Sequence, residues 1–192
     1  MKYLQLYESW NPLSKSDIEA VRDLNSIGVV SDKELRDLKH RMGIEQMILN
    51  YDPNGYNGFN GTGNLYLRNS TELTGLPDGL KISGYLELSG CENLKSLGAG
   101  LEVKKDCHLY GCINLESLPA NLKVGGSLNL SDCISLTSLP AGLEVGGHLF
   151  LNGCVGLTSL PADLKVRGNL NLVRCFGLES LPDNLAVGQI IR

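Results

Sequence analysis

The stretch SLNLSDCISLTSLPAGLEVGG, Ser127–Gly147, decides the fold, because closely related stretches recur along the chain at a fixed spacing. The shared pattern is G-x-L-x-L-x-x-C-x-x-L-x-S-L-P-x-x-L-x-V-x, and its period is 21 residues. Six full units begin at Gly63, Gly84, Lys105, Gly126, Gly147 and Gly168, and a truncated seventh begins at Gln189. A pattern that keeps its register over many units is typical of a solenoid, in which each unit forms one coil and contacts only its neighbours.

Alternation of apolar and polar residues within each unit predicts short strands. In LEVGGHLFL (143–151), the apolar residues Leu143, Val145, Leu149 and Leu151 alternate with polar or small ones, and the glycine pair between them divides the run into two strands. The proline of Leu-Pro ends the sheet, because proline cannot donate to a ladder. Two residues later stands Gly, Asn or Asp, which tolerates left-handed backbone angles. Each coil should therefore contain a strand, a corner, an extended return, a tight turn and a second short strand.

The core motif L-x-L-x-x-C-x-x-L, followed by S-L-P, resembles the leucine-rich repeat, whose pattern is L-x-L-x-x-N/C-x-L. The resemblance covers about two-thirds of the chain, and the extra residue between Cys and the next Leu matches cysteine-type members. It implies that the first strands line a concave surface and that the N/C side chain turns inward at a corner, bonded to neighbouring backbone. The Leu-x-Val segment favours a second short strand over a helix on the outer edge. We therefore predict a mainly β solenoid of the leucine-rich-repeat kind.

Five cysteines occupy the corner position of successive units: Cys91, Cys112, Cys133, Cys154 and Cys175. Ser70 takes this position in the first unit, which a structural corner tolerates and thiol chemistry would not. We expect a ladder of free, buried thiols; the alternative is a redox or metal protein that uses this ladder. Cys107 replaces the first strand leucine of its unit, and we expect it in the core.

The composition points to a globular chain of 192 residues, with 42% hydrophobic and 20% charged residues and a formal net charge of −4. Its Lys and Arg residues are scattered, so nucleic-acid binding is not expected. The sequence shows neither a signal-peptide core nor a run long enough to span a bilayer, so no membrane partner is expected. We predict a cytoplasmic protein, or one exported without a cleavable signal.

Catalytic motifs are not supported by the residue pattern. The glycine-rich run NGYNGFNGTG (54–63) precedes a strand, whereas a phosphate loop precedes a helix. The serines that recur before Leu-Pro have no matching histidine or acid to activate them. His108 and His148 lie two units apart, roughly 10 Å by strand spacing, which is too far to share a metal. We therefore predict that the protein is not an enzyme and needs no cofactor or metal.

Two rows of residues should face outward. In the first strands, the predicted partner-binding residues are Tyr66, Tyr85, Glu87, Asp106, His108, Tyr110, Asn129, His148, Phe150 and Asn171. Exposed aromatic side chains among polar ones are typical of protein-recognition surfaces, although such residues also suit an ordinary solvated strand face. At the nineteenth position of the units, charge alternates through Lys81, Glu102, Lys123, Glu144, Lys165 and then Ala186. This alternation should control the register of stacking.

The termini differ from the repeats. Capping boxes at Ser16 and Ser31 and helical apolar stripes predict a helical hairpin over residues 1–50, which caps the solenoid, followed by a Gly/Asn-rich linker at 51–62 and the solenoid at 63–192. The predicted function is a non-catalytic module that binds a partner protein through the concave sheet. A hairpin followed by short Leu-Pro repeats also resembles secreted bacterial effectors, so a secreted or phage-encoded inhibitor of a host enzyme is an alternative. A third is a structural protein that associates with itself through the C-terminal edge strand.

Overall fold

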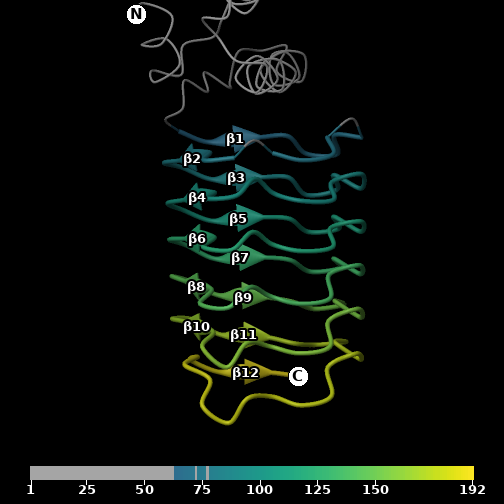
Figure 1. Ribbon diagram of the computed structural model, residues 1–192, viewed down its shortest axis with the longest axis vertical. Coiled ribbons are helices and arrows are strands. Elements are labelled where there is room, and N and C mark those ends of the chain that lie inside the picture. The colour runs from purple at the N-terminus through teal and green to yellow at the C-terminus, as the bar shows by residue number, and fades with distance from the viewer. Residues whose placement is uncertain (1–62, 72, 77) are drawn as a thin grey trace, which may run out of the picture. The chain divides into compact units, whose positions relative to one another are not determined.

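The computed structural model describes residues 63–71, 73–76 and 78–192; the predicted hairpin at 1–50 and linker at 51–62 lie outside them. The described residues form a parallel β-solenoid in which each of the first five coils contributes one strand to each of two sheets, and the last two coils contribute a strand to one sheet only (Figure 1). Within these ranges, no helix is long and apolar enough to cross a membrane.

The strands are two residues long and alternate between the sheets along the chain. The seven-stranded sheet contains β1 (Leu65–Tyr66), β3 (Leu86–Glu87), β5 (Cys107–His108), β7 (Leu128–Asn129), β9 (Leu149–Phe150), β11 (Leu170–Asn171) and β12 (Ile190–Ile191). The five-stranded sheet contains β2 (Lys81–Ile82), β4 (Glu102–Val103), β6 (Lys123–Val124), β8 (Glu144–Val145) and β10 (Lys165–Val166). The predicted second strand at Leu-x-Val is thus confirmed, and the outer edge carries strands instead of helices.

Stacked apolar side chains fill the space between the two sheets. Leu65, Leu86, Leu128, Leu149 and Leu170 form one column that is fully buried, and Cys107 continues it in the third coil with no exposed surface. The valines of the second strands form another column, no more than 3% exposed. Each fully buried leucine or valine contributes roughly 1.5–3 kcal/mol, so the stacking of coils supplies the core that a single coil cannot build.

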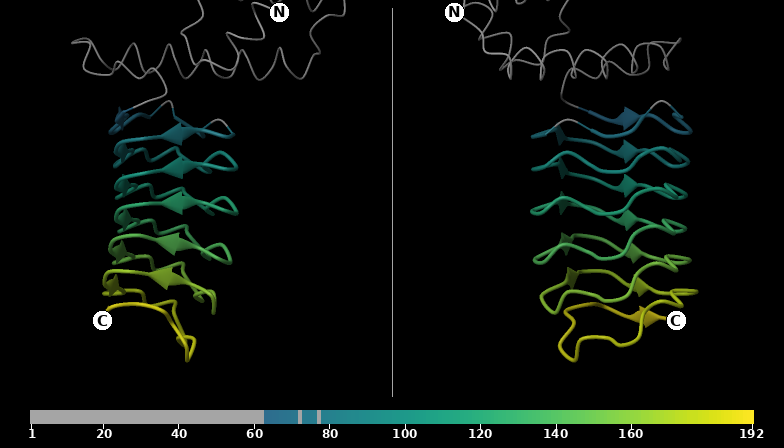
Figure 2. Two further views of the ribbon diagram at one scale, coloured as in Figure 1. Left: turned by 90° about the vertical axis from the view of Figure 1, so that its left-hand side faces the viewer. Right: turned by 45° about the vertical axis from the view of Figure 1, so that its right-hand side comes forward.

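The coils stack in a nearly straight column (Figures 1 and 2). The resemblance implied a concave inner sheet, and a solenoid curves in that way when its outer side is wider than its inner side. Here both sides carry parallel strands, which are spaced about 4.8 Å apart in either sheet. Because the two sides have the same repeat along the axis, the coils are not wedge-shaped and the seven-stranded sheet presents a flat outer face.

The last coil junction is one residue shorter than the others. Elsewhere partner residues lie 21 apart, as in Leu149 and Leu170, but Leu170 pairs with Ile190. The seventh coil therefore begins at Gly188, which donates a backbone hydrogen bond to Gly168, and the prediction of Gln189 was wrong by one residue. The backbones approach closely here, since a Cβ at residue 188 would lie 2.8 Å from the Gly168 carbonyl oxygen. The ladder thus aligns glycine with glycine even where the spacing in sequence changes.

Left-handed backbone angles occur at one turn of all six full coils and at a second turn of the first four. The residue before the corner cysteine, or before Ser70, has a positive φ in all six coils: Asn69, Gly90, Gly111, Asp132, Gly153 and Arg174. The second turn, which follows Leu-Pro or, in the second coil, Leu97-Gly98, is left-handed at Gly79, Gly100, Asn121 and Gly142. The same prediction was wrong for Asp163 and Asn184, where the turn closes without a positive φ.

Candidate functional site

The ten predicted partner-binding residues all come from the outward-facing positions of the seven-stranded sheet. Burial alternates along each strand, as in β1, where Leu65 and Leu67 are buried and Tyr66 between them is 43% exposed. The middle outward residue of each coil lies within a strand, in the order Tyr66, Glu87, His108, Asn129, Phe150 and Asn171. Parallel pairing places these six side chains in one row along the solenoid axis.

This middle row alternates between aromatic and polar side chains with a period of two coils. Glu87, Asn129 and Asn171, in the even-numbered coils, each accept a hydrogen bond from the backbone N–H two residues later, at 3.0, 3.0 and 3.1 Å. These side chains therefore lie along their own strands. The odd-numbered coils carry Tyr66, His108 and Phe150 instead. The period is visible in the sequence as a 42-residue repeat superimposed on the 21-residue one, and the sequence analysis did not use it.

A second outward row, one residue before the strands, links successive coils through side-chain acceptors. Asp106 Oδ1 accepts from the Ser127 N–H at 2.7 Å, Ser127 Oγ from the His148 N–H at 3.1 Å, and His148 Nδ1 from the Asn169 N–H at 2.9 Å. Because Nδ1 of His148 accepts, its ring proton lies on Nε2. Two residues predicted to bind a partner, Asp106 and His148, thus have a stacking role in the solenoid itself.

The exposed aromatic surface concentrates in the first three coils. Tyr66, Tyr85 and Tyr110 are 43%, 37% and 51% exposed. The Lys105 ammonium lies 5.7 Å from the centre of the Tyr85 ring, which is a cation–π distance. An ion pair between Arg68 and Glu87, at 3.5 Å, flanks these rings.

In the fifth coil, His148 and Phe150 form a pair of rings with centroids 5.9 Å apart, tilted by 44°. Phe150 is half-buried, so this pair offers less apolar surface than the tyrosines. Up to the edge strand of the seventh coil, the large hydrophobic side chains that are exposed on this face therefore lie in coils 1 to 3.

The corner cysteines are buried, free thiols that bond to the preceding coil. Each Sγ donates to the carbonyl oxygen of the second strand leucine one coil earlier, at 2.9 to 3.2 Å, as Cys112 does to Leu88. Burial raises the pKa of Cys112 and of Cys154 to about 12. A thiol must ionise to attack or to bind a metal, so burial disfavours the form of these groups that such chemistry needs. In the described part of the chain, no group of three His, Cys, Asp or Glu residues is placed to hold a metal ion.

The charged row on the five-stranded sheet forms ion pairs between coils. Glu102 lies 3.9 Å from Lys81 and 3.4 Å from Lys123, and Lys165 donates a hydrogen bond to Glu144. This bond, together with the charge of Lys165, holds the pKa of the Glu144 carboxyl below its usual value, and the pKa of Lys165 is raised by the same contact. The alternation predicted from the sequence therefore places opposite charges side by side.

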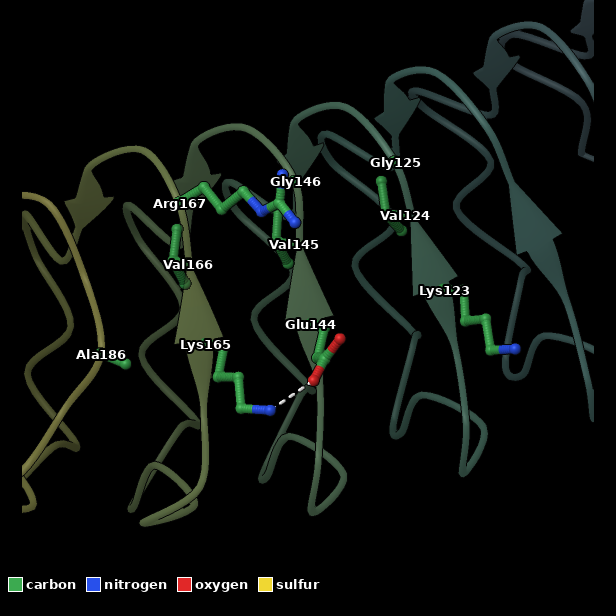
Figure 3. Close-up of a pocket in the computed structure, with 10 residues that line it drawn as sticks. All are labelled: Lys123, Val124, Gly125, Glu144, Val145, Gly146, Lys165, Val166, Arg167 and Ala186. Atoms are coloured by element: carbon green, nitrogen blue, oxygen red, sulfur yellow. Dashed lines mark hydrogen bonds and ion pairs between the residues drawn. The ribbon is translucent and has the colours of Figure 1, made fainter.

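Two surface features were missed by the sequence analysis. An apolar stripe follows the corner cysteines in coils 4 to 6, where Ile134, Val155 and Phe176 are 45%, 45% and 82% exposed. The signal was present, since an apolar residue follows each of the last three cysteines. The second feature is an open trough of about 660 Å³ across β6, β8 and β10 on the five-stranded sheet (Figure 3). Its lining combines residues from four coils: Lys123, Val124, Gly125, Glu144, Val145, Gly146, Lys165, Val166, Arg167 and Ala186.

Comparison of the chain with models of protein families, with curated proteins and with solved structures found no match. The geometry described above is therefore the basis for the functional proposals that follow.

Proposed function

We propose that this chain is a non-catalytic protein-recognition module of the leucine-rich-repeat type, which binds a partner protein through the outer face of the seven-stranded sheet. One observation carries the proposal. Three tyrosines, Tyr66, Tyr85 and Tyr110, are each more than a third exposed on the same sheet face, in three successive coils. Tyrosine is enriched at the energetic centres of protein interfaces, because its ring offers a large apolar area and its hydroxyl a polar contact.

The surroundings of the tyrosines support recognition by a preformed surface. Glu87 is held by the Ser89 N–H, and Asn64 accepts from the Tyr85 N–H at 2.8 Å. Side chains that are already ordered lose little conformational entropy on binding, so more of the contact energy becomes affinity. A flat sheet with fixed polar groups and protruding rings therefore suits a folded protein partner.

The leucine-rich-repeat assignment is supported by the corner residues. The resemblance implied that the cysteine side chain turns inward and bonds to neighbouring backbone. Cys91 does so on the Leu67 carbonyl oxygen at 2.9 Å, and its equivalents repeat the contact in each later coil. The strands on the outer edge distinguish this chain from repeats of the same type that carry a helix there.

A pair of matched variants tests the proposal. The full chain carrying Tyr85→Ala and Tyr110→Ala is compared with Phe176→Ala, which removes an aromatic ring of even greater exposure outside the proposed surface. Each protein is immobilised and challenged with host lysate, and bound proteins are quantified by mass spectrometry after circular dichroism has shown equal folding. We expect a partner that is retained by the wild type and by Phe176→Ala, and that is reduced at least tenfold by the tyrosine variant.

Photo-crosslinking identifies the contact directly. A benzophenone side chain is introduced at position 110, and separately at position 176 as the control. A crosslink to one protein from position 110 alone would support the proposal. The assigned surface would be contradicted by a partner that crosslinks only from position 176, or by one that the tyrosine variant retains in full. Crosslinks between two copies of the chain would show self-association in place of a different partner protein.

A further inference from the structure

The trough on the five-stranded sheet has a floor without side chains at two neighbouring coils. Gly125 and Gly146 occupy the position that Lys104 holds one coil earlier and Arg167 one coil later. A Cβ at residue 146 would lie 2.0 Å from the Gly125 carbonyl oxygen, so the local backbone of these two glycines leaves no room for a side chain. The open floor at Gly125 and Gly146 therefore does not depend on the rotamer of a side chain.

Arg167 extends over this floor. Figure 3 shows its side chain reaching from its own coil toward Gly146, above the strands β8 and β10. Within the residues that the structure describes, no carboxylate lies within ion-pair distance of the Arg167 guanidinium. An arginine presents five N–H donors in a planar fork that matches a carboxylate. Its position over an open floor leaves this fork accessible to a ligand.

The trough is positively charged, whereas the whole chain has a net charge of −4. Lys123, Lys165 and Arg167 line it, and Glu144 is the acidic residue among its lining side chains. Glu144 is bonded to Lys165, and the neighbouring Glu102 is shared between two lysines, so the row retains an excess of positive charge. Charge complementarity therefore favours an anionic partner in the trough.

The spacing of the cations indicates what kind of anion would fit. Lys123 and Lys165 occupy equivalent positions two coils apart, which is about 9.6 Å along the axis at a strand spacing of about 4.8 Å. A polyproline II helix advances about 3.1 Å per residue with three residues per turn, so every third side chain recurs on one face at about 9.3 Å. A nucleic-acid strand bears a phosphate on every nucleotide, and Glu144 between the lysines would repel part of that charge.

We propose that this trough binds an acidic peptide segment in the polyproline II conformation, laid along the solenoid axis. An Asp or Glu at every third residue faces the lysines, and a further carboxylate of the segment meets the Arg167 fork. The face is distinct from the seven-stranded sheet, so this peptide site is independent of the partner surface proposed above. The strands β4, β6 and β8, which lie between the edge strands β2 and β10, are paired on both sides. The peptide is therefore bound by side chains and does not add a strand to the sheet.

The test uses the full chain and a fluorescent peptide, (Glu-Pro-Pro)₅, whose binding is followed by fluorescence anisotropy at low and at physiological salt. A peptide of the same composition with its five glutamates in one block, and a single-stranded oligonucleotide of equal charge, are the comparison ligands. We expect saturable binding of the spaced peptide, with an affinity that falls as the salt concentration rises. The affinity for the block peptide should be at least fivefold lower, and that for the oligonucleotide lower still.

Two pairs of variants locate the site. Arg167→Ala removes the free fork, and Lys95→Ala removes one exposed cation from the return segment as its control. Ala186→Glu adds a carboxylate beside Lys165, and Ala186→Gln adds the same bulk without charge. We expect at least fivefold weaker binding in Arg167→Ala and in Ala186→Glu, with both controls within twofold of wild type and all four folded by circular dichroism. Equal affinity for the block peptide, tighter binding of the oligonucleotide, absence of saturation, or indifference to both variants would overturn the proposal.

Discussion

The Cys133 thiol donates a hydrogen bond to the carbonyl oxygen of Leu109, 3.2 Å away in the preceding coil. The contact lies just beyond the strand, where the backbone turns into the left-handed residue Asp132 and leaves the ladder. The same Leu109 oxygen also accepts from the Cys112 N–H of its own coil at 3.1 Å, so the thiol supplies a second donor, from the next coil. The cysteine ladder therefore continues the sheet by means of side chains.

Substitution of Cys133 should separate the role of its hydrogen bond from that of its volume. Cys133→Ala removes one of the two donors to the Leu109 carbonyl oxygen and should lower the free energy of unfolding by about 0.5–1.5 kcal/mol. Cys133→Ser keeps a donor, as Ser70 does at the same position of the first coil, and should cost less than half as much. Urea denaturation of the three proteins measures both values. Equal stability of the alanine and serine variants would show that the hydrogen bond has no net effect.

Alkaline pH should destabilise the solenoid through its buried thiols. Burial raises the pKa of Cys112 and of Cys154 from 9.0 to about 12 in the folded chain. Above pH 9 the unfolded chain loses thiol protons that the folded chain keeps, so the unfolded state binds fewer protons and stability falls as pH rises toward 12. The loss should approach about 1.4 kcal/mol per pH unit for each such thiol. Urea midpoints at pH 8, 9, 10 and 11, for the wild type and for Cys112→Ser, measure this loss. Stability that does not change with pH, in the wild type and in Cys112→Ser alike, would contradict this account.

The His148 side chain should act as a hydrogen-bond acceptor between coils. Its Nδ1 accepts from the Asn169 N–H, and Asn64 provides the same acceptor to Tyr85 in the first coil. His148→Asn should therefore leave stability nearly unchanged, whereas His148→Leu should cost about 0.5–1 kcal/mol, because water can reach this exposed edge in part. Hydrogen exchange of the Asn169 amide reports the bond directly. Equal protection of that amide in the leucine and asparagine variants would argue against it.

Extending the charge alternation should strengthen the last full coil. Ala186 pairs with Lys165 at the position where glutamate follows lysine in the earlier coils. Ala186→Glu should raise the unfolding temperature slightly at low salt, relative to Ala186→Gln, and the difference should disappear at high salt because exposed ion pairs are screened. A difference that persists in 1 M salt would point to packing instead of charge.

Gly146 should be required for the local backbone packing of its coil on the preceding one, although other coils carry Lys104 and Arg167 at this position. Gly146→Ala brings a Cβ to 2.0 Å from the Gly125 carbonyl oxygen, a backbone atom that cannot move alone, and should cost about 2 kcal/mol or more. Gly75→Ala is the matched control, since its nearest contact would be an ordinary 3.6 Å. The control should be neutral or slightly stabilising, because alanine restricts the unfolded chain. Thermal unfolding of both variants measures the contrast, and similar losses would show that the coils can separate to admit a methyl group.

Most of the solenoid could be predicted because its information is local. The alternation around Leu143 and Val145 specifies a strand, whatever the rest of the chain does. The 21-residue period then places each leucine over its equivalent, which is why the buried columns and the inward cysteines agreed with expectation. The predicted register was wrong only at the last coil, which is one residue shorter than the 21-residue period. There Gly188 pairs with Gly168, and the repeat pattern gives no sign of this pairing.

The surfaces were harder to predict because they depend on residues 21 or 42 apart. The sequence shows that His148 faces outward, but its bond to Asn169 follows from the height of one coil above the next. The trough likewise requires Gly125, Gly146 and Arg167 to lie side by side across three coils. A repeat pattern specifies the shape of one coil and the direction of each side chain. The distances between side chains of different coils, which create hydrogen bonds, ion pairs and binding surfaces, exist only once the coils have stacked.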